Sequence, residues 1–323
     1  MHFTIVGAGA LGTILAAHLV HSGHRVSCVV RENRAKQLHA NGLRITGLKE
    51  MSAECEIITD PATLDQTNVL IVGTKTYQTL TAIESLRHLK LGAVFSIANG
   101  VKKNEQLASV FQPKTITGCM ANVSGELLAD GTVNFTRNVC LHLGALEKAG
   151  EPMVETVAEE IDRAGVVCRA EQDIRSVEWS KYVGWVAFMS LAAITRARTC
   201  DFLMNANHAD FAARLIKEMA EIARAKNIKL IDQSPMPVKT IAEAPGQAAR
   251  DAVIDMGQQF AKEAPEHRLS ALQDLERGAR LEHEDTLGYA LEQARALDLP
   301  AATIADCFDL VSGIDAINRL HRG

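Results

Sequence analysis

The sequence predicts an N-terminal α/β domain built on a parallel sheet, residues 1–171, followed by an all-helical domain, residues 172–323. Three observations support this prediction. A chain of 323 residues exceeds one ordinary core. In the first half, short apolar runs alternate with helical patterns, as in sheets covered on both faces. From residue 173 onward, almost only helical periodicity remains.

Composition excludes several functional classes. The net charge is −5 and no basic tract is present, so we expect no nucleic-acid partner. The longest apolar run, residues 183–194, is shorter than the about 20 residues that cross a bilayer. A strand is expected at the N-terminus, which leaves no room for a signal peptide. Seven scattered cysteines are typical of reduced thiols in a cytoplasmic protein.

A glycine-rich turn follows the first apolar run, His2–Val6. A helical pattern and a second strand, residues 25–30, come after it. In this strand–turn–helix–strand context a GxGxxG motif indicates a Rossmann-type dinucleotide site, whose pyrophosphate binds at the helix N-terminus. The alternative is a glycine-rich turn without a ligand. The predicted cofactor-binding turn comprises Gly7, Ala8, Gly9, Ala10, Leu11 and Gly12.

Arg31 stands at the end of the second strand, where an acidic residue would accept hydrogen bonds from the ribose of NAD. A guanidinium instead matches a 2′-phosphate. We therefore predict a preference for NADP(H). The alternative is that Arg31 is a solvated charge and that Glu32 binds the ribose.

Two further strands are predicted at residues 68–74 and 93–99, and polar residues follow each. Ligands of open α/β sheets bind outside the carboxyl ends of the strands. Lys75 and Asn99 should therefore face the cofactor, although each could also serve in a turn or cap. Residues 115–146 resemble a hairpin that returns to the sheet, before a helix at 151–164 and a strand at 166–169.

His18, His21 and His24 recur every third residue near a predicted helix end. No carboxylate or cysteine joins them, so we expect three partly solvated histidines and no metal. A protonated histidine interacts favourably with the negative end of the helix dipole at the helix C-terminus.

Lys181 lies in a strongly apolar helical pattern over residues 173–189. Apolar surroundings disfavour the charged form and tend to lower the pKa of a lysine, which suits an acid or base that acts near neutral pH. The alternative is a lysine that lays its stem along the core and keeps its amine in water.

The remaining helices are predicted at residues 201–226, 239–260, 270–290 and 300–316, with a turn at 230–237. Glu282 could pair with Lys181, although it also fits an acidic helix face. The long apolar helices could bury against a second copy in a homodimer or fill the core of a monomer.

Taken in order, these residues resemble the ketopantoate reductase (2-dehydropantoate 2-reductase) family over nearly the whole chain. The pattern consists of the glycine turn, Arg31, Lys75, Asn99-Gly100, Lys181, Ser270 with Asp274, and Glu282. The resemblance implies a Rossmann domain with a helical C-terminal domain. It also implies NADPH-dependent reduction of a 2-oxo acid to a 2-hydroxy acid, with Lys181 as general acid. As a mechanistic hypothesis, Glu282 would hold the lysine in position, and Asn99 would orient the nicotinamide end and help to place the lysine.

The sequence departs from that family at its substrate asparagines. The positions four and eight residues after the lysine are Trp185 and Met189, and the position three residues before Ser270 is His267. A site built to hydrogen-bond a polar group discriminates strongly by that bond. The change therefore favours a bulkier or aromatic substrate, contacted by Lys181, Trp185, Met189, His267 and Ser270.

Three functions remain open at this stage. The first is ketopantoate reduction with tolerated substitutions. The second is a dehydrogenase of the same fold for another 2-hydroxy acid. The third is a non-catalytic NADP-binding redox sensor, which the presence of Lys181, Asn99 and Glu282 disfavours.

Overall fold

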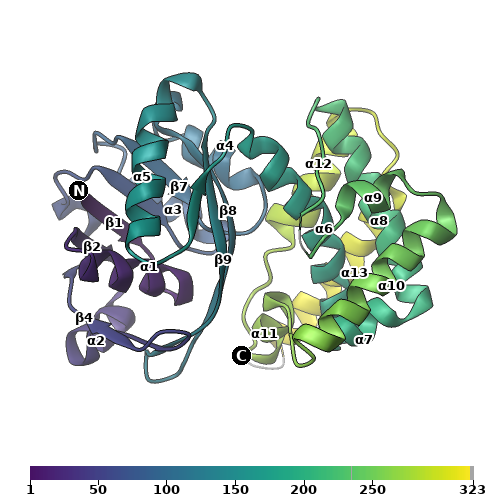
Figure 1. Cartoon of the computed structure of the whole chain (residues 1–323), viewed down its shortest axis with the longest axis horizontal. Helices are drawn as coiled ribbons and strands as arrows, with labels where there is room; N and C mark the ends of the chain where they lie inside the picture. Colours follow the sequence, from purple (N-terminus) through teal and green to yellow (C-terminus); the bar gives the residue numbers. More distant parts are fainter. Residues whose placement is uncertain (234, 321–323) are drawn as a thin grey trace. The chain divides into compact units, whose positions relative to one another are not determined.

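The computed structural model describes residues 1–233 and 235–320, and it divides into two compact units, Met1–Arg175 and Ser176–Gly323. The sequence placed this boundary after residue 171. The first unit is a parallel α/β domain and the second is helical (Figure 1). The predicted fold class is thereby confirmed.

The main sheet of the first unit is parallel throughout, with strand order β5-β2-β1-β6-β7. Its strands are short because the polar residues predicted at their carboxyl ends form loops instead. These strands are β1 His2–Val6, β2 Arg25–Val29, β5 Glu56–Ile58, β6 Val69–Val72 and β7 Ala93–Ser96. The connecting helices are α1 Ala10–His21, α2 Glu32–Asn41, α3 Thr76–Glu84 and α4 Lys102–Ala108.

The predicted hairpin forms a second sheet, which corrects the expectation that it returns to the first. Strands β8 Thr117–Leu127 and β9 Val133–Ala145 pair antiparallel. Strand β9 also pairs in parallel with β3 Leu43–Gly47 and with β10 Cys168–Ala170, and β3 pairs with β4 Met51–Ala53. An isolated bridge from Val94 to Ile116 links the hairpin to the main sheet. The prediction was wrong because it did not include strands at residues 43–53. Without them, the main sheet was the only sheet to which the hairpin could be assigned.

Helix α1 shares one apolar core with both sheets. Ile14 and Leu19 pack in the same cluster as Ile5 of the main sheet and Leu141 of the second. A separate cluster, which includes Val72 of β6, covers the opposite face of the main sheet. Helix α5, Glu151–Arg163, packs against β9 and β10 (Figure 1). The glycine-rich start of α1 is therefore anchored on a rigid double layer.

The second unit consists of helices, several of them shorter than predicted. They are α6 Ile174–Thr195, α7 Thr199–Met204, α8 Ala206–Ala225, α9 Val238–Glu243, α10 Gly246–Glu263, α11 Ser270–Glu276, α12 Tyr289–Ala296 and α13 Ala302–Leu320, with a π-helix, η4, at Glu284–Gly288.

Three predicted helices of the second unit are interrupted at local breakers. The Asn205 side chain accepts hydrogen bonds from the amides of Asn207 and His208, and so starts α8 as its N-cap. Pro245 precedes α10, where its missing N–H costs nothing. Gly278, with φ +68°, follows the end of α11. Hydrophobic periodicity continued across all three breaks and concealed them.

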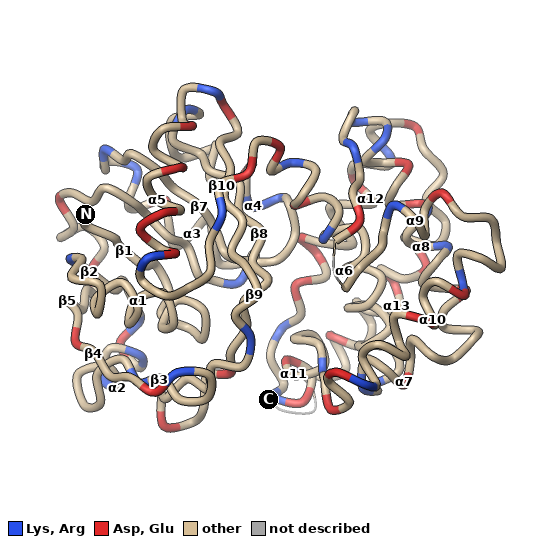
Figure 2. The backbone as a smooth tube through the Cα atoms, viewed as in Figure 1, with Lys and Arg blue, Asp and Glu red and all other residues tan. Residues whose placement is uncertain are grey.

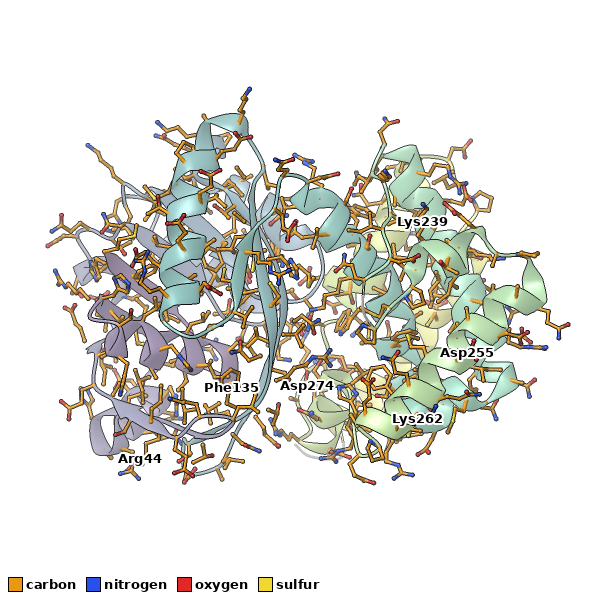
Figure 3. The ribbon with its side chains drawn as sticks, viewed as in Figure 1. Arg44, Phe135, Lys239, Asp255, Lys262 and Asp274 are labelled. Atoms are coloured by element: carbon orange, nitrogen blue, oxygen red, sulfur yellow. The ribbon has the colours of Figure 1, made fainter. Side chains whose placement is uncertain are left out.

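The three histidines predicted near the end of α1, His18, His21 and His24, are not equivalent, which corrects their expected solvation. His18 is 4% exposed, and its Nδ1 lies 2.9 Å from the carbonyl oxygen of Ala164. Its ring packs edge-on against Phe135 of β9; Phe135 is labelled in Figure 3. The His24 Nε2 lies 3.0 Å from Glu160, whereas His21 is exposed. His18 therefore belongs to the core.

The two units are alike in how their charged and apolar residues are distributed. Acidic and basic residues are interspersed along the backbone of each unit (Figure 2). Within residues 1–233 and 235–320, no helix is long and apolar enough to cross a bilayer. In the same ranges, no three His, Cys, Asp or Glu side chains are grouped to hold a metal.

Candidate active site

The glycine turn joins β1 to α1, and each of its glycines meets a different constraint. Gly7 has φ +92°, which favours glycine. A Cβ at Gly12 would overlap the carbonyl oxygen of Gly7. A Cβ at Gly9 would meet no atom within 4 Å, so this side of the turn is open. The turn thus leaves room for a group at the N-terminus of α1, where backbone N–H groups attract anions.

Arg34 holds this turn and was not recognised from the sequence. Its Nε donates to the carbonyl oxygen of Ala8 at 2.8 Å, and its Nη2 donates to the Thr13 hydroxyl at 3.0 Å. Its Nη1 donates to the carbonyl oxygen of Gly131, between β8 and β9, at 3.0 Å. Burial lowers the pKa of Arg34. The only sequence signal was a basic residue in the first turn of α2, where the helix dipole disfavours one.

Arg31 has a different environment, although it lies three residues away. It is the exposed N-cap residue of α2, at the carboxyl end of β2. Over residues 1–233 and 235–320 the Arg31 side chain makes no hydrogen bond or ion pair. Its guanidinium can therefore bind an added anion without breaking an existing contact.

Lys75 and Asn99 follow neighbouring parallel strands, β6 and β7, at the same edge of the sheet as the glycine turn. Lys75 is the N-cap residue of α3. The side-chain amide of Gln106 in α4 donates to the carbonyl oxygen of Thr76 at 3.2 Å, which ties the loop after β6 to the helix after β7.

Lys103 fixes the loop that contains Asn99. Its side chain is 3% exposed, and its ammonium donates to the carbonyl oxygens of Ala98, at 2.9 Å, and of Cys119. Gly100 beside it has φ +81°. A buried ammonium needs such acceptors, so Lys103 joins the end of β7 to β8. No sequence pattern predicts this role, because a lysine in a helix is normally solvated.

Lys181 interrupts the buried stretch of α6. Between Ser176 and Ala193 all residues are buried except Lys181, which is of intermediate exposure. Trp185, 7% exposed, and Met189, 2% exposed, follow at four-residue intervals and so share its face of the helix. The predicted acid and two predicted substrate contacts therefore form one stripe.

Glu282 lies beside the π-helix η4 and is 7% exposed. Its carbonyl oxygen accepts a hydrogen bond from the Thr286 hydroxyl at 2.7 Å. The carbonyl oxygen of Thr286 in turn accepts from the Tyr182 hydroxyl at 2.7 Å. Because Tyr182 is adjacent to Lys181 in sequence, the segment that carries Glu282 is tied to the helix that carries Lys181.

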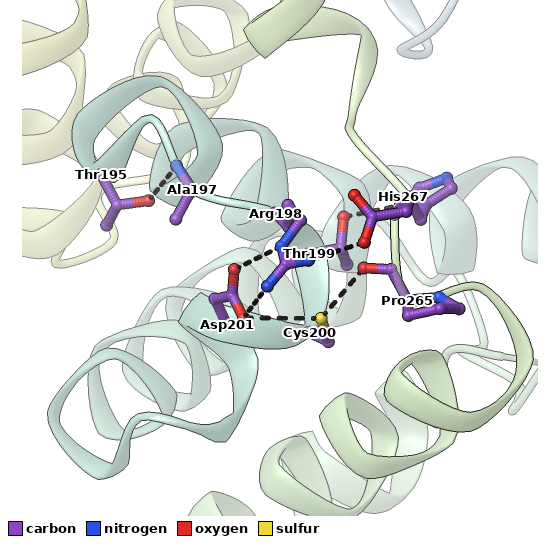
Figure 4. Close-up of polar contacts among 9 residues, drawn as sticks. Thr195, Ala197, Arg198, Thr199, Cys200, Asp201, Pro265 and His267 are labelled. Atoms are coloured by element: carbon purple, nitrogen blue, oxygen red, sulfur yellow. Dashed lines mark hydrogen bonds and ion pairs between the residues drawn. The ribbon is translucent and has the colours of Figure 1, made fainter.

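His267 has a fixed ring position before α11. Its Nδ1 lies 2.9 Å from the Thr199 hydroxyl, and its carbonyl oxygen accepts from the Thr199 amide at 3.0 Å (Figure 4). Its ring centroid lies 5.1 Å from that of Phe260. Arg198 bridges Asp201 and Glu266 beside this contact. Ser270 begins α11, which also carries Asp274 (Figure 3).

Each unit therefore assembles one part of the predicted set. The first unit brings the glycine turn, Arg31, Lys75 and Asn99 to one edge of its sheet. In the second unit, bonds from Tyr182 to Thr286 and from Thr286 to the Glu282 carbonyl oxygen tie the segment of Glu282 to the helix that carries Lys181. A dinucleotide phosphate fits the first arrangement, and a half-buried lysine on an apolar helix face fits the role of a proton donor.

Comparison with known proteins gives one consistent family. The profile described as ketopantoate reductase PanE/ApbA matches residues 3–148, and the profile of its C-terminal part matches residues 173–315. The chain is similar to a 2-dehydropantoate 2-reductase of Pyrococcus abyssi, with 25% identity over 98% of this chain and 99% of that one.

Solved structures share the fold at lower identity. A PanE/ApbA family ketopantoate reductase from Ralstonia eutropha JMP134 superposes with a TM-score of 0.82 and 21% identity, covering 99% of this chain and 100% of that one. D-mandelate dehydrogenase, in a ternary structure with NADH and anilino(oxo)acetate, gives a TM-score of 0.84 at 18% identity, covering 98% of this chain and 99% of that one.

Proposed function

The chain belongs to the ketopantoate reductase PanE/ApbA family, and on this basis we propose that it reduces a 2-oxo acid to the 2-hydroxy acid with NADPH. The observation that carries the proposal is the arrangement on α6. Lys181 is the one incompletely buried residue of a buried helical stretch, and its neighbour Tyr182 is bonded to the segment of Glu282. An ammonium in that position can protonate an oxygen that becomes an alkoxide.

The first unit supplies the binding groups for the cofactor in this proposal. The open side of Gly9 and the N–H groups at the start of α1 would hold the pyrophosphate. Arg31 would bind the 2′-phosphate, and Lys75 would add a second cation. Asn99 would orient the nicotinamide end. The bound, reduced nicotinamide supplies a hydride.

The second unit supplies the proton. The Lys181 ammonium would donate its proton to the substrate oxygen as charge develops there. Glu282 would keep the amine charged, because a nearby carboxylate favours the protonated form and opposes the effect of apolar surroundings. His267, Ser270, Trp185 and Met189 would contact the rest of the substrate.

Replacement of Lys181 by alanine tests the reaction. With NADPH and ketopantoate, or with a better 2-oxo acid from a panel, we expect kcat to fall by about 10²- to 10⁴-fold, the usual contribution of a positioned acid. The Kd for NADPH, measured by fluorescence quenching, should be unchanged. Lys226→Ala is the matched control, because Lys226 bonds Gln293 in another part of the second unit at 2.6 Å. An undiminished kcat in Lys181→Ala removes this lysine from the chemistry.

A bulkier, aromatic 2-oxo acid is the second candidate substrate. Trp185 and Met189 stand on the Lys181 face, and the mandelate dehydrogenase of the same fold was solved with anilino(oxo)acetate. The ratio of kcat/KM for phenylglyoxylate to that for ketopantoate decides between the two. If the aromatic acid is preferred, Trp185→Asn should shift the ratio toward ketopantoate. A ratio below one in the unaltered protein favours ketopantoate itself.

A further inference from the structure

A π-helix follows Glu282 in the second unit. Residues Glu284–Gly288 form η4, in which the Gly288 amide donates to the carbonyl oxygen of His283, five residues back, at 2.9 Å. Such turns are rare and occur frequently at functional sites. The contacts around this turn therefore bear on the position of Glu282.

Asp315 of α13 holds the start of this segment. Its side chain is 0% exposed, and its Oδ1 accepts a hydrogen bond from the Leu281 amide at 2.8 Å. Its Oδ2 lies 3.1 Å from the Arg319 Nε. Hydrogen bonds to a buried charged acceptor are stronger than neutral ones, so the residue directly before Glu282 is firmly anchored.

Tyr182 and Thr286 hold the other side of Glu282. Thr286 is 0% exposed and Tyr182 is 2% exposed, so water does not compete for their bonds. The Tyr182 hydroxyl donates to the Thr286 carbonyl oxygen, and the Thr286 hydroxyl donates to the Glu282 carbonyl oxygen, each at 2.7 Å. Trp179 packs edge-on against the Tyr182 ring, with centroids 5.5 Å apart, which restricts the direction of the hydroxyl.

We propose that Tyr182, Thr286 and Asp315 are positioning residues that hold the backbone of Glu282 on both sides and so keep its carboxylate in register with Lys181. The inference rests on the proposed function, in which Lys181 and Glu282 act together. The three residues do not touch the substrate in this scheme. They act through Glu282, and the two bonds in series from Tyr182 transmit the position of α6 to the π-helix.

The test is a double-mutant cycle between Tyr182→Phe and Glu282→Gln, assayed with NADPH and the best substrate of the 2-oxo acid panel. Tyr182→Phe removes one hydroxyl and leaves the ring. We expect kcat to fall by about 10- to 100-fold, since displacement of a reacting group by about 1 Å costs up to 10². The Kd for NADPH should be unchanged. In the Glu282→Gln background the same substitution should have little further effect, because the two residues act as one unit.

The pH profile of kcat separates positioning from loss of stability. Weaker contact with a carboxylate makes the Lys181 ammonium easier to deprotonate. The basic limb of the profile should therefore move to lower pH in Tyr182→Phe, in the same direction as in Glu282→Gln and by less. Ser190→Ala is the control: it also removes a buried hydroxyl from α6, but that hydroxyl bonds the Val186 carbonyl oxygen at 2.7 Å and the Cys307 thiol, neither of which lies in residues 281–288. It should leave the limb in place.

Asp315 offers a conservative rescue. Asp315→Asn retains an oxygen acceptor for the Leu281 amide and should keep most of kcat, whereas Asp315→Ala should lose it. Hydrogen–deuterium exchange over residues 281–289 gives a readout that needs no turnover and should show faster exchange in Tyr182→Phe.

The outcomes separate this inference from the proposed function. If Glu282→Gln is slow while Tyr182→Phe keeps the kcat and exchange of the unaltered protein, only the positioning role fails. Equal loss from Tyr182→Phe in both backgrounds overturns it as well. If neither Lys181→Ala nor Glu282→Gln lowers kcat, the proposed function fails and the positioning role fails with it.

Discussion

The two units build their parts of the candidate site in opposite ways. In the first unit the candidate site is formed mainly by backbone features: a glycine turn, a helix N-terminus and two strand ends lie at one sheet edge. In the second unit it is formed by buried side chains, and the bond from Tyr182 to Thr286 spans 104 positions in the chain. The first arrangement is specified by short contiguous motifs, and the second requires the whole helical fold.

Substitution of the turn glycines is the strongest test of the backbone side of this contrast. In Gly12→Ala the new Cβ would overlap the carbonyl oxygen of Gly7. We expect a loss of about 3 kcal/mol in the free energy of unfolding, the upper end of ordinary overpacking, since a backbone carbonyl cannot rotate aside. Urea unfolding of the whole protein, followed by circular dichroism, measures this loss.

Gly9→Ala is the matched control, because its Cβ would meet no atom within 4 Å. It should unfold like the unaltered protein but bind NADPH more weakly, as the methyl group would occupy the place of the pyrophosphate. Equal NADPH affinity in Gly9→Ala and the unaltered protein would contradict the assignment of this turn to the cofactor.

This contrast also explains what could be predicted from the sequence. The strands around the glycine turn were found because their apolar runs and turn signals are local. The sheet formed by β3, β4, β9 and β10 was not found, because its partners are distant and β3 and β4 are short and partly exposed. Likewise Lys181 stood out against an apolar helix, whereas Arg34 and Lys103 act through backbone carbonyls that no sequence pattern reveals.

The two arginines of the first unit sharpen the comparison, since one is predicted to bind a ligand and the other supports the backbone. Arg31→Ala should raise the Kd for NADPH by about 10- to 100-fold, the equivalent of one or two charged hydrogen bonds. The Kd for NADH should stay the same, because NADH has no 2′-phosphate. Isothermal titration with both cofactors measures the two values.

Arg34→Ala is expected to behave differently, because Arg34 bonds Ala8, Thr13 and Gly131. The substitution should raise the Kd for NADPH and the Kd for NADH by the same factor, and it should lower the unfolding temperature. If Arg31→Ala instead loses the same factor of affinity for NADPH and for NADH, Arg31 does not recognise the 2′-phosphate. The ribose would then be bound by another group, for which Glu32 is the first candidate.

The smallest expected effect concerns His18, a polar side chain within the backbone-built unit. Burial lowers the pKa of His18, although its bond to Ala164 opposes the shift. Above the unfolded value of about 6.5 the ring is neutral in both states. As the pH falls below that value, the unfolded chain gains a proton that the folded chain resists, so the free energy of unfolding decreases. Each such group contributes at most about 1.4 kcal/mol per pH unit.

Urea unfolding at several pH values between 7.5 and 5 measures this effect. The free energy of unfolding should fall less steeply with decreasing pH in His18→Gln than in the unaltered protein, and the exposed His21→Gln is the control. Because burial also lowers the pKa of His2 and His24, part of the slope should persist in His18→Gln. An unchanged slope would mean that His18 is protonated as easily in the folded state as in the unfolded chain, and that the contact between α1 and β9 admits water.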